Sequence, residues 1–163
     1  MTQAGTHIPV GMILLGTGVD SRRIEKRIAG SPHIRLFAPV YDRERLARIM
    51  ASCDALVHGS EAEPLGLVAS EAMAAGLPLI SPDTGGCAEI ADPHCSETYT
   101  ARDLASCAEA IQRLFARDQM LLRRAARVAA GRVRSDREHT EDLMAYYAGL
   151  VAARRGGGMA VAA

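Results

Sequence analysis

The stretch DALVHGSEAEPLGLVASEAMAAGLPLIS, residues 54–81, decides the fold of this chain. Residues 54–60 and 77–81 are short runs with apolar centres, which are typical of strands buried in a parallel sheet. Between them, residues 64–75 read as a loop entering a helix, which Gly76 ends and Pro78 keeps from continuing. The segment therefore predicts a strand, a helix and a second strand in the order of a right-handed crossover unit.

Two further strand and helix pairs precede this unit. Residues 10–16, VGMILLG, form a continuous apolar run that suits a strand buried on both faces. The glycine turn after it leads to a helix that Asp20 or Ser21 can cap. A second strand is expected at residues 33–40, and Asp42 can cap the helix that follows it.

Downstream of the unit the pattern changes from strands to helices. A fifth strand candidate covers residues 97–100, and amphipathic helices follow as far as about residue 153. We therefore predict an α/β fold for residues 1–154, a three-layer Rossmann-like domain with a parallel sheet and flanking helices. The glycine-rich tail, residues 155–163, is expected to be disordered. Sheets of this kind bind ligands at the carboxyl ends of their strands.

Composition excludes several classes of protein. The 163 residues include 19 basic and 19 acidic side chains, so no overall field attracts nucleic acid, and no nucleic-acid partner is expected. No apolar run approaches the roughly 20 residues that span a bilayer, and the N-terminus lacks a basic leader region. The four cysteines form no C-x-x-C pair, which indicates reduced thiols rather than a metal site. These features predict a cytoplasmic protein.

The segment after the strand at residues 54–60 suits an anion. Pro64 has no N–H and its fixed φ suits a helix entrance, while Gly66 removes a side chain where the backbone would approach a ligand. The amides of residues 65–68 are then the unpaired donors of a helix N-terminus, whose dipole favours a negative charge. A diphosphate fits such a site.

Two carboxylates flank this predicted anion site. Glu63 precedes the helix, and Glu71 lies about one and a half turns into it. A carboxylate accepts two hydrogen bonds side by side, which matches the vicinal hydroxyls of a ribose or a hexose. The pair therefore suits a ligand with a sugar on each side of a diphosphate, as in a nucleotide-sugar. On spacing alone, a chance pair of glutamates beside core residues is the favoured interpretation.

The chain around these residues, HGSEAEPLGLVASEAMAAGLPLISPDTGGCAEI at 58–90, resembles a known family. It is similar to the family-4 retaining glycosyltransferases of the GT-B fold, in the pattern of an acidic residue, a P/G-F-G-L turn, E-A-M-A-x-G-x-P-V-I and G-G-x-x-E. The resemblance extends through LLGTGVDSRRIEKRI at residues 14–28 and IRLFAPVYDRERLARIMASCDALVHGS at 34–60. It covers roughly residues 10–150, and residues 63–89 are its specific part.

The resemblance implies a role for each matching residue. Glu63 would be the catalytic-site residue that binds donor-sugar hydroxyls near the reacting carbon, and Glu71 would bind the ribose hydroxyls. The backbone of Leu65, Gly66 and Leu67 would bind the diphosphate. Further donor-binding candidates are Gly16, Gly18, Gly85, Gly86 and Glu89. The resemblance implies no metal and no other cofactor, because a helix dipole and basic side chains stabilise the leaving diphosphate.

Several features depart from the family pattern. Leu65 replaces the usual Phe, and Ala38 stands where a glycine commonly lets the backbone approach the base. The family's donor domain begins with a further strand, central in the sheet, and a loop with an Arg and a Lys that contact the phosphates. The ten residues up to Val10 are too few to supply these parts or the N-terminal acceptor domain. We therefore expect the first strand to be missing and the acceptor domain to be supplied in cis or by a separate chain.

The predicted function is transfer of a sugar from a nucleoside diphosphate donor to an acceptor, with retention of configuration. The alternative is a truncated, non-catalytic nucleotide-sugar-binding module that acts as a partner or regulatory subunit. A nucleotide-sugar epimerase or hydrolase is a further rival, and a nicotinamide oxidoreductase is disfavoured because Ser21 stands at the third glycine position of its fingerprint. The arginines at 123, 124, 127, 132 and 134 read as a solvated face, or alternatively as a peripheral contact with the inner face of the membrane.

Overall fold

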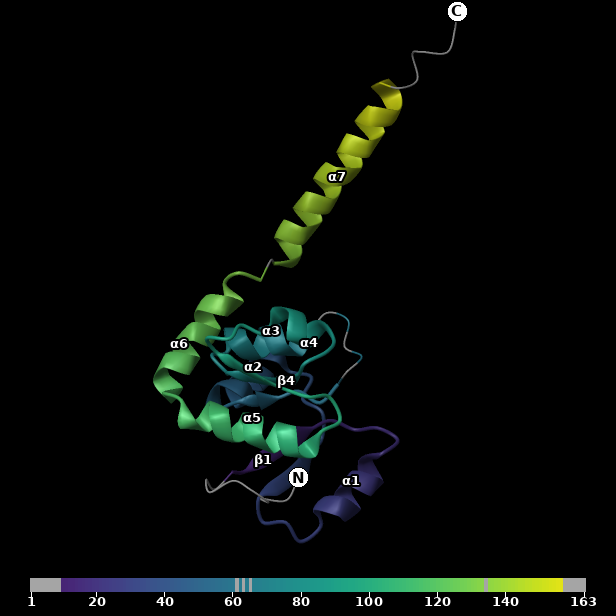
Figure 1. The fold of residues 1–163 in the computed structure, drawn as a ribbon. Helices are drawn as coiled ribbons and strands as arrows, with labels where there is room; N and C mark the ends of the chain where they lie inside the picture. Colours follow the sequence, from purple (N-terminus) through teal and green to yellow (C-terminus); the bar gives the residue numbers. More distant parts are fainter. Residues whose placement is uncertain (1–9, 61, 63, 65, 134, 157–163) are drawn as a thin grey trace, which may run out of the picture. The chain divides into compact units, whose positions relative to one another are not determined.

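The computed structural model describes residues 10–60, 62, 64, 66–133 and 135–156, with side chains as far as residue 154 apart from those gaps. The chain divides into two compact units, one ending at Ala130 and one beginning at Gly131. The first unit contains five strands and six helices within its described residues, and the second contains one helix. Figure 1 shows these elements along the chain.

Strands and helices alternate through most of the first unit, as the sequence predicts. In chain order they are β1 Met12–Leu15, α1 Ser21–Ile28, β2 Ile34–Phe37, α2 Arg43–Ser52, β3 Leu56–Val57, α3 Leu67–Ala74, β4 Leu79–Pro82, α4 Gly86–Ile90, β5 Ser96–Tyr99, α5 Leu104–Ala116 and α6 Gln119–Ala130. All strand pairs are parallel. The predicted α/β class with parallel strands and flanking helices is confirmed.

The described strands form two sheets. β1 pairs with β2, with Met12 opposite Ile34 and Leu15 opposite Phe37. β3, β4 and β5 form the second sheet in that order. In the described part of the chain β1 and β3 therefore each have one edge without a strand partner.

β4 is the centre of the three-layer part of the unit. All four of its residues are buried, and successive side chains point to opposite faces. Ile80 packs with residues of α5, including Ile111 and Leu114, whereas Leu79 packs with Ala69 of α3 and Cys87 of α4. In Figure 1, α5 accordingly lies on one side of β4, and α3 and α4 lie on the other.

The expectation that residues 10–16 form a strand buried on both faces is wrong. Ile13 and Leu15 are 43% and 37% exposed, and Phe37, which pairs with Leu15 on the same face, is 51% exposed. The residues that alternate with them on β1, Met12 and Leu14, are only half-buried. The face of Ile13 and Leu15 is therefore only partly covered by the described chain, so the apolar run is not enclosed.

The end of α3 follows the predicted chemistry. Gly76 has a φ of 82°, the left-handed conformation that glycine adopts without strain. Its amide donates to the oxygen of Met73 at 2.8 Å, and the amide of Leu77 donates to that of Ala72 at 2.9 Å. This is the Schellman pattern, in which two hydrogen bonds satisfy the last helical carbonyls and an apolar contact accompanies them. Leu77 and Ala72 lie in one core cluster, which supplies that contact.

The interpretation of the α6 arginines as a solvated face is wrong for Arg123, which is partly buried, whereas Arg124 and Arg127 are exposed. Arg123 donates a short hydrogen bond to the oxygen of Cys53, and its guanidinium lies 3.1 Å from the Asp54 carboxylate. Arg127 lies against the end of α3, where its Nε would be 2.8 Å from a Cβ placed at Gly76. Arg123 therefore joins α6 to the segment before β3, and Arg127 lies between α6 and the end of α3.

The second unit is built around α7, Asp136–Gly156. All of the α7 side chains that the structure describes, up to Arg154, are exposed, including those of Tyr146, Tyr147 and Leu150. Residues 157–163, most of the tail that the sequence assigns to disorder, lie outside the described residues. Of the helices that the structure describes, none combines the length and apolar character needed to cross a membrane.

Candidate functional site

The amino end of α3 carries the predicted diphosphate site. Gly66 immediately precedes the helix and has a φ of 62°, and Leu67 is the first helical residue. Ala69 and Ser70 donate to the oxygen of Gly66 at 2.9 and 3.1 Å, so the helical hydrogen bonds begin after Val68. Leu67 is 63% exposed, whereas Gly66 itself is buried against Gly86 and Ile90. Glu63 and Leu65, the other two predicted residues of this loop, lie outside the described residues.

A second glycine turn packs directly on the first. A Cβ placed at Gly66 would lie 3.3 Å from both the carbonyl carbon and oxygen of Gly86, and 3.0 Å from Cδ1 of Ile90. Gly86 is the first residue of α4, and Gly85 before it has a φ of 83°. Glu89 lies on the same short helix and is exposed. The structure thus brings Gly66, Gly85 and Gly86 to one place, which their separate motifs did not establish.

Glu71 lies on α3 with a basic partner from α2. Nη2 of Arg43 is 2.7 Å from Oε1 of Glu71, and the two side chains are 85% and 38% exposed. The carboxylate therefore remains accessible to a ligand while it is held from a second helix. Arg43 could not be predicted from the sequence, because no local pattern connects it with a glutamate 28 residues further on.

The glycine turn after β1 is open. The amide of Gly16 donates to the oxygen of Phe37 at 3.1 Å, and that of Gly18 donates to Oγ of Ser21 at 2.8 Å. A Cβ at either glycine would meet no other atom within 4 Å. This turn therefore has the space that a ligand would need, but the described contacts do not join it to α3.

Two buried polar side chains lie at the carboxyl ends of β3 and β4. His58 is 9% exposed; its amide donates to the oxygen of Ile80, and its own oxygen accepts from the Tyr99 hydroxyl, both at 2.8 Å. Within the described part of the chain, Nε2 of His58 and Oγ of the fully buried Ser81 have no hydrogen-bond partner. Ser81 lies within the stretch that resembles the glycosyltransferases, between its E-A-M-A-x-G-x-P-V-I and G-G-x-x-E parts, and no role was predicted for it.

The cysteines do not form a reactive or metal-binding cluster. Cys87, Cys95 and Cys107 are buried, and Cys53 is partly exposed. Burial raises the pKa of the Cys107 thiol, and burial together with the nearby Asp54 carboxylate raises that of Cys53. Raised thiol pKa values keep these groups protonated near neutral pH, which disfavours nucleophilic attack and metal binding. Among the described residues no three His, Cys, Asp or Glu side chains are placed to bind one metal ion.

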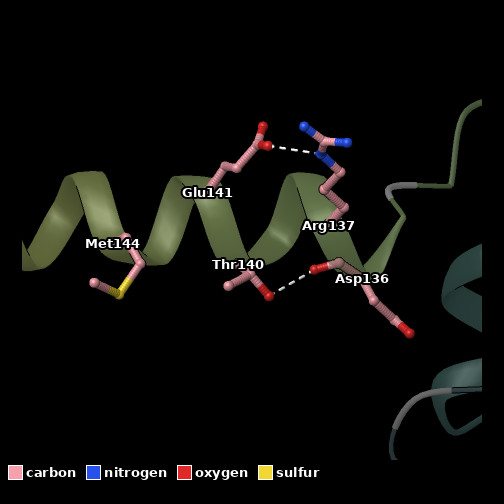
Figure 2. Close-up of a pocket in the computed structure, with 5 residues that line it drawn as sticks. All are labelled: Asp136, Arg137, Thr140, Glu141 and Met144. Atoms are coloured by element: carbon pink, nitrogen blue, oxygen red, sulfur yellow. Dashed lines mark hydrogen bonds and ion pairs between the residues drawn. The ribbon is translucent and has the colours of Figure 1, made fainter.

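The second unit has a surface depression whose lining residues all belong to a single helix. Figure 2 shows its lining residues, which all belong to α7: Asp136, Arg137, Thr140, Glu141 and Met144. Nε of Arg137 is 2.9 Å from Oε1 of Glu141, and the Thr140 hydroxyl donates to the oxygen of Asp136 at 2.7 Å. Side chains of a single exposed helix cannot enclose a ligand, and no predicted site residue lies here.

Comparisons with known proteins identify the family of this chain. The family model described as glycosyl transferases, group 1, matches residues 2–117. The chain belongs to the group 1 glycosyltransferases. A GDP-mannose-dependent alpha-mannosyltransferase of Mycobacterium tuberculosis (strain CDC 1551 / Oshkosh) is 36% identical over 85 residues, which are 52% of this chain and 21% of that protein. The glycogen synthase of the same strain is 34% identical over 116 residues, covering 71% of this chain and 28% of the relative.

Solved structures show the same fold for this glycosyltransferase chain. Sucrose-phosphate synthase from Thermosynechococcus elongatus superposes with a TM-score of 0.75 and 28% identity, covering 86% of this chain and 38% of that one. A glycosyltransferase from Rickettsia africae ESF-5 gives a TM-score of 0.74 at 19% identity, covering 91% of this chain and 42% of that one. The chain thus spans 21% and 28% of the two curated relatives' length and about two fifths of these structures.

Proposed function

We propose that this chain is the C-terminal, donor-binding half of a family-4 retaining glycosyltransferase of the GT-B fold. In this role it binds a nucleoside diphosphate sugar and presents the sugar to an acceptor. The observation that carries the proposal is the amino end of α3, where Gly66 has no side chain, Leu67 is exposed, and Glu71 remains 38% exposed further along the helix. The nucleotide-sugar in the name of the M. tuberculosis mannosyltransferase supports the ligand class.

Each part of the donor has a matching group. The diphosphate binds the amides at the entrance of α3, where the helix dipole favours a negative charge. Glu71 accepts hydrogen bonds from the two ribose hydroxyls, and Glu63, outside the described residues, binds the transferred sugar. When the bond between the sugar and the diphosphate breaks, negative charge accumulates on the diphosphate, and the same amides stabilise it. This chemistry requires no metal or other cofactor.

The contact between Gly66 and Gly86 brings two glycine turns together at this place. A side chain at Gly66 would meet the backbone of the second turn at 3.3 Å, so the two turns approach as closely as glycine allows. Gly85, Gly86 and the nearby Glu89 are proposed to border the donor sugar. Gly16 and Gly18 are proposed to contact the nucleotide from the turn after β1.

We also propose that the complete enzyme contains a further strand and an acceptor domain, either in the same polypeptide or in a separate chain. The division of the described strands into two sheets supports this proposal, because β1 and β3 each lack a partner along one edge. Unpaired parallel edges and uncovered apolar side chains are unusual in such sheets, which are normally enclosed on both faces. The exposed side chains of Ile13, Leu15 and Phe37 fit a face that another segment covers.

Calorimetry with UDP, GDP and ADP tests donor binding. We expect one of them to bind the chain and Glu71→Ala to weaken that binding about tenfold or more, because hydrogen bonds to a charged group are lost. Glu25→Ala, which removes the same charge from the exposed face of α1, is the matched control and should bind as the unmodified chain does. Equal affinities for the two variants would contradict the proposed role of Glu71.

A transfer assay separates the enzyme from the alternative, a non-catalytic binding module. The chain is incubated with radiolabelled nucleotide-sugars, alone and with the segment encoded immediately upstream or in a neighbouring reading frame. We expect no sugar transfer by the chain alone and transfer by the completed protein. Binding without transfer by the completed protein would favour the regulatory module.

A further inference from the structure

The ion pair between Arg43 and Glu71 joins two helices at the place where the proposed function puts the ribose. Arg43 is the first residue of α2, and Glu71 lies in the interior of α3. One guanidinium nitrogen of Arg43, Nη2, lies 2.7 Å from one carboxylate oxygen of Glu71, Oε1. At this distance the contact is a charge-assisted hydrogen bond, which is shorter and stronger than a neutral one.

The packing of α2 on α3 fixes the position from which Arg43 reaches. Met50 of α2 lies in one core cluster with Ala72 and Leu77, against which Leu46 and Val68 also pack. The start of α2 is capped by Asp42, whose carboxylate accepts the amide of Arg45 at 2.8 Å. The backbone of Arg43 is therefore held in a defined position beside α3, although its own side chain is exposed.

We propose that Arg43 is a positioning residue for the nucleotide: it holds the Glu71 carboxylate in the orientation that receives the two ribose hydroxyls. The inference rests on the proposed function and names a residue that acts through Glu71. A carboxylate has about four acceptor positions, so a single bond from Arg43 leaves enough for two hydroxyl donors. An unheld glutamate would lose side-chain freedom when it binds the ribose, and Arg43 removes part of that cost before the ligand arrives.

A simpler role for Arg43 would be general attraction of the anionic diphosphate. Any arginine on α2 would contribute to that attraction, because salt screens the attraction between exposed charges only beyond roughly 10 Å at moderate ionic strength. Arg48 lies on the same helix and is 72% exposed, but it pairs with Glu44 at 3.5 Å. Arg48→Ala therefore removes the same charge from the same helix and leaves the Glu71 contact in place, which makes it the matched control.

The experiment measures dissociation constants by NMR titration of the full chain, which detects weak binding. The probes are UDP, GDP and ADP, followed by the 2′,3′-dideoxy form of whichever binds most tightly. We expect Arg43→Ala to weaken binding of the ribonucleotide about fivefold, and binding of the dideoxynucleotide by less than about twofold. Arg48→Ala should change both dissociation constants by less than about twofold. The dissociation constant of Arg43→Lys for the ribonucleotide should lie between those of the unmodified chain and Arg43→Ala, because an ammonium group lacks the planar fork of arginine.

Three outcomes would count against the inference. The first is that Arg43→Ala weakens binding of the ribonucleotide and the dideoxynucleotide equally, or weakens binding no more than Arg48→Ala does. Arg43 then does not act through the ribose, and the inference fails while the proposed function stands. If Arg43→Ala weakens binding further in a chain that already carries Glu71→Gln, its effect does not pass through Glu71. If the unmodified chain binds none of the three nucleotides, the proposed function fails and the inference fails with it.

Discussion

Gly66 packs against the backbone of Gly86: a Cβ placed at Gly66 would lie 3.3 Å from the Gly86 carbonyl carbon and oxygen. Gly66 precedes α3, and Gly86 begins α4. The contact therefore brings the amino ends of two helices together beside the carboxyl end of β4. In an α/β fold ligands bind at this edge of the sheet, and the contact brings the two glycine motifs of the sequence together there.

Gly66→Ala should destabilise the first unit. The φ of 62° costs a residue with a Cβ about 1–2 kcal/mol, and the new methyl group would also meet Ile90 and the backbone of Gly86. We expect a loss of about 2 kcal/mol in the free energy of unfolding, measured by urea denaturation. Gly18→Ala is the control, because a Cβ there meets nothing within 4 Å and should change stability by well under half as much. Equal losses for the two variants would show that the contact between Gly66 and Gly86 does not contribute to the free energy of unfolding.

Gly76→Ala tests whether backbone conformation or crowding matters at the end of α3. A Cβ here would lie 2.8 Å from Nε of Arg127, but that atom belongs to the far part of a flexible side chain, which can move away. The φ of 82° cannot be relieved in this way. We therefore expect a loss of about 1 kcal/mol that persists in an Arg127→Ala background. Disappearance of the loss in that background would show that crowding is its cause.

Local sequence chemistry was sufficient for the parts of the fold that depend on neighbouring residues. The helix stop at Gly76 follows from the left-handed conformation that glycine alone adopts easily, and the Asp42 cap follows from its side chain accepting an amide two or three positions later. The strand expected at residues 97–100 is β5, Ser96–Tyr99, one residue earlier. The parallel pairing also followed, because short apolar runs separated by helices leave few other arrangements.

Contacts between segments far apart in the chain could not be predicted from neighbouring residues. The Arg43–Glu71 and Arg123–Asp54 pairs join residues 28 and 69 positions apart, and no periodic pattern connects them. The burial of β1 was predicted wrongly because an apolar run shows that a strand can be covered, not that a cover is present. The predicted roles of Glu63 and Leu65 stay predictions, since both lie outside the described residues.

Arg117 should contribute more to stability than Arg113, although both pair with Glu97. The guanidinium of Arg117 donates to the oxygens of Pro93, His94 and Ser96 as well as to the Glu97 carboxylate, and its side chain is 33% exposed. Arg113 is 49% exposed and donates to Glu97 and the oxygen of Thr98.

Removal of Arg117 leaves several carbonyl groups at the start of β5 without a donor. We expect Arg117→Ala to lower the free energy of unfolding by about 2 kcal/mol and Arg113→Ala by about half of that. Arg117→Lys should restore little, because an ammonium group cannot reproduce the forked set of donors. A larger loss for Arg113→Ala than for Arg117→Ala in urea denaturation would contradict this ranking.

Cys53 should react slowly with iodoacetamide at neutral pH although it is the one partly exposed cysteine of the four. Burial and the Asp54 carboxylate raise the pKa of its thiol, and only the thiolate attacks. Asp54→Asn removes the charge that disfavours the thiolate, so the pKa should fall and alkylation at a fixed pH near 8 should become several-fold faster. Mass spectrometry of labelled peptides over a pH series measures the rate at this site. Glu44→Gln is the control: it removes an exposed carboxylate of α2 and should leave the alkylation rate unchanged. If Asp54→Asn does not shift the pH profile of alkylation, burial alone raises the pKa of Cys53.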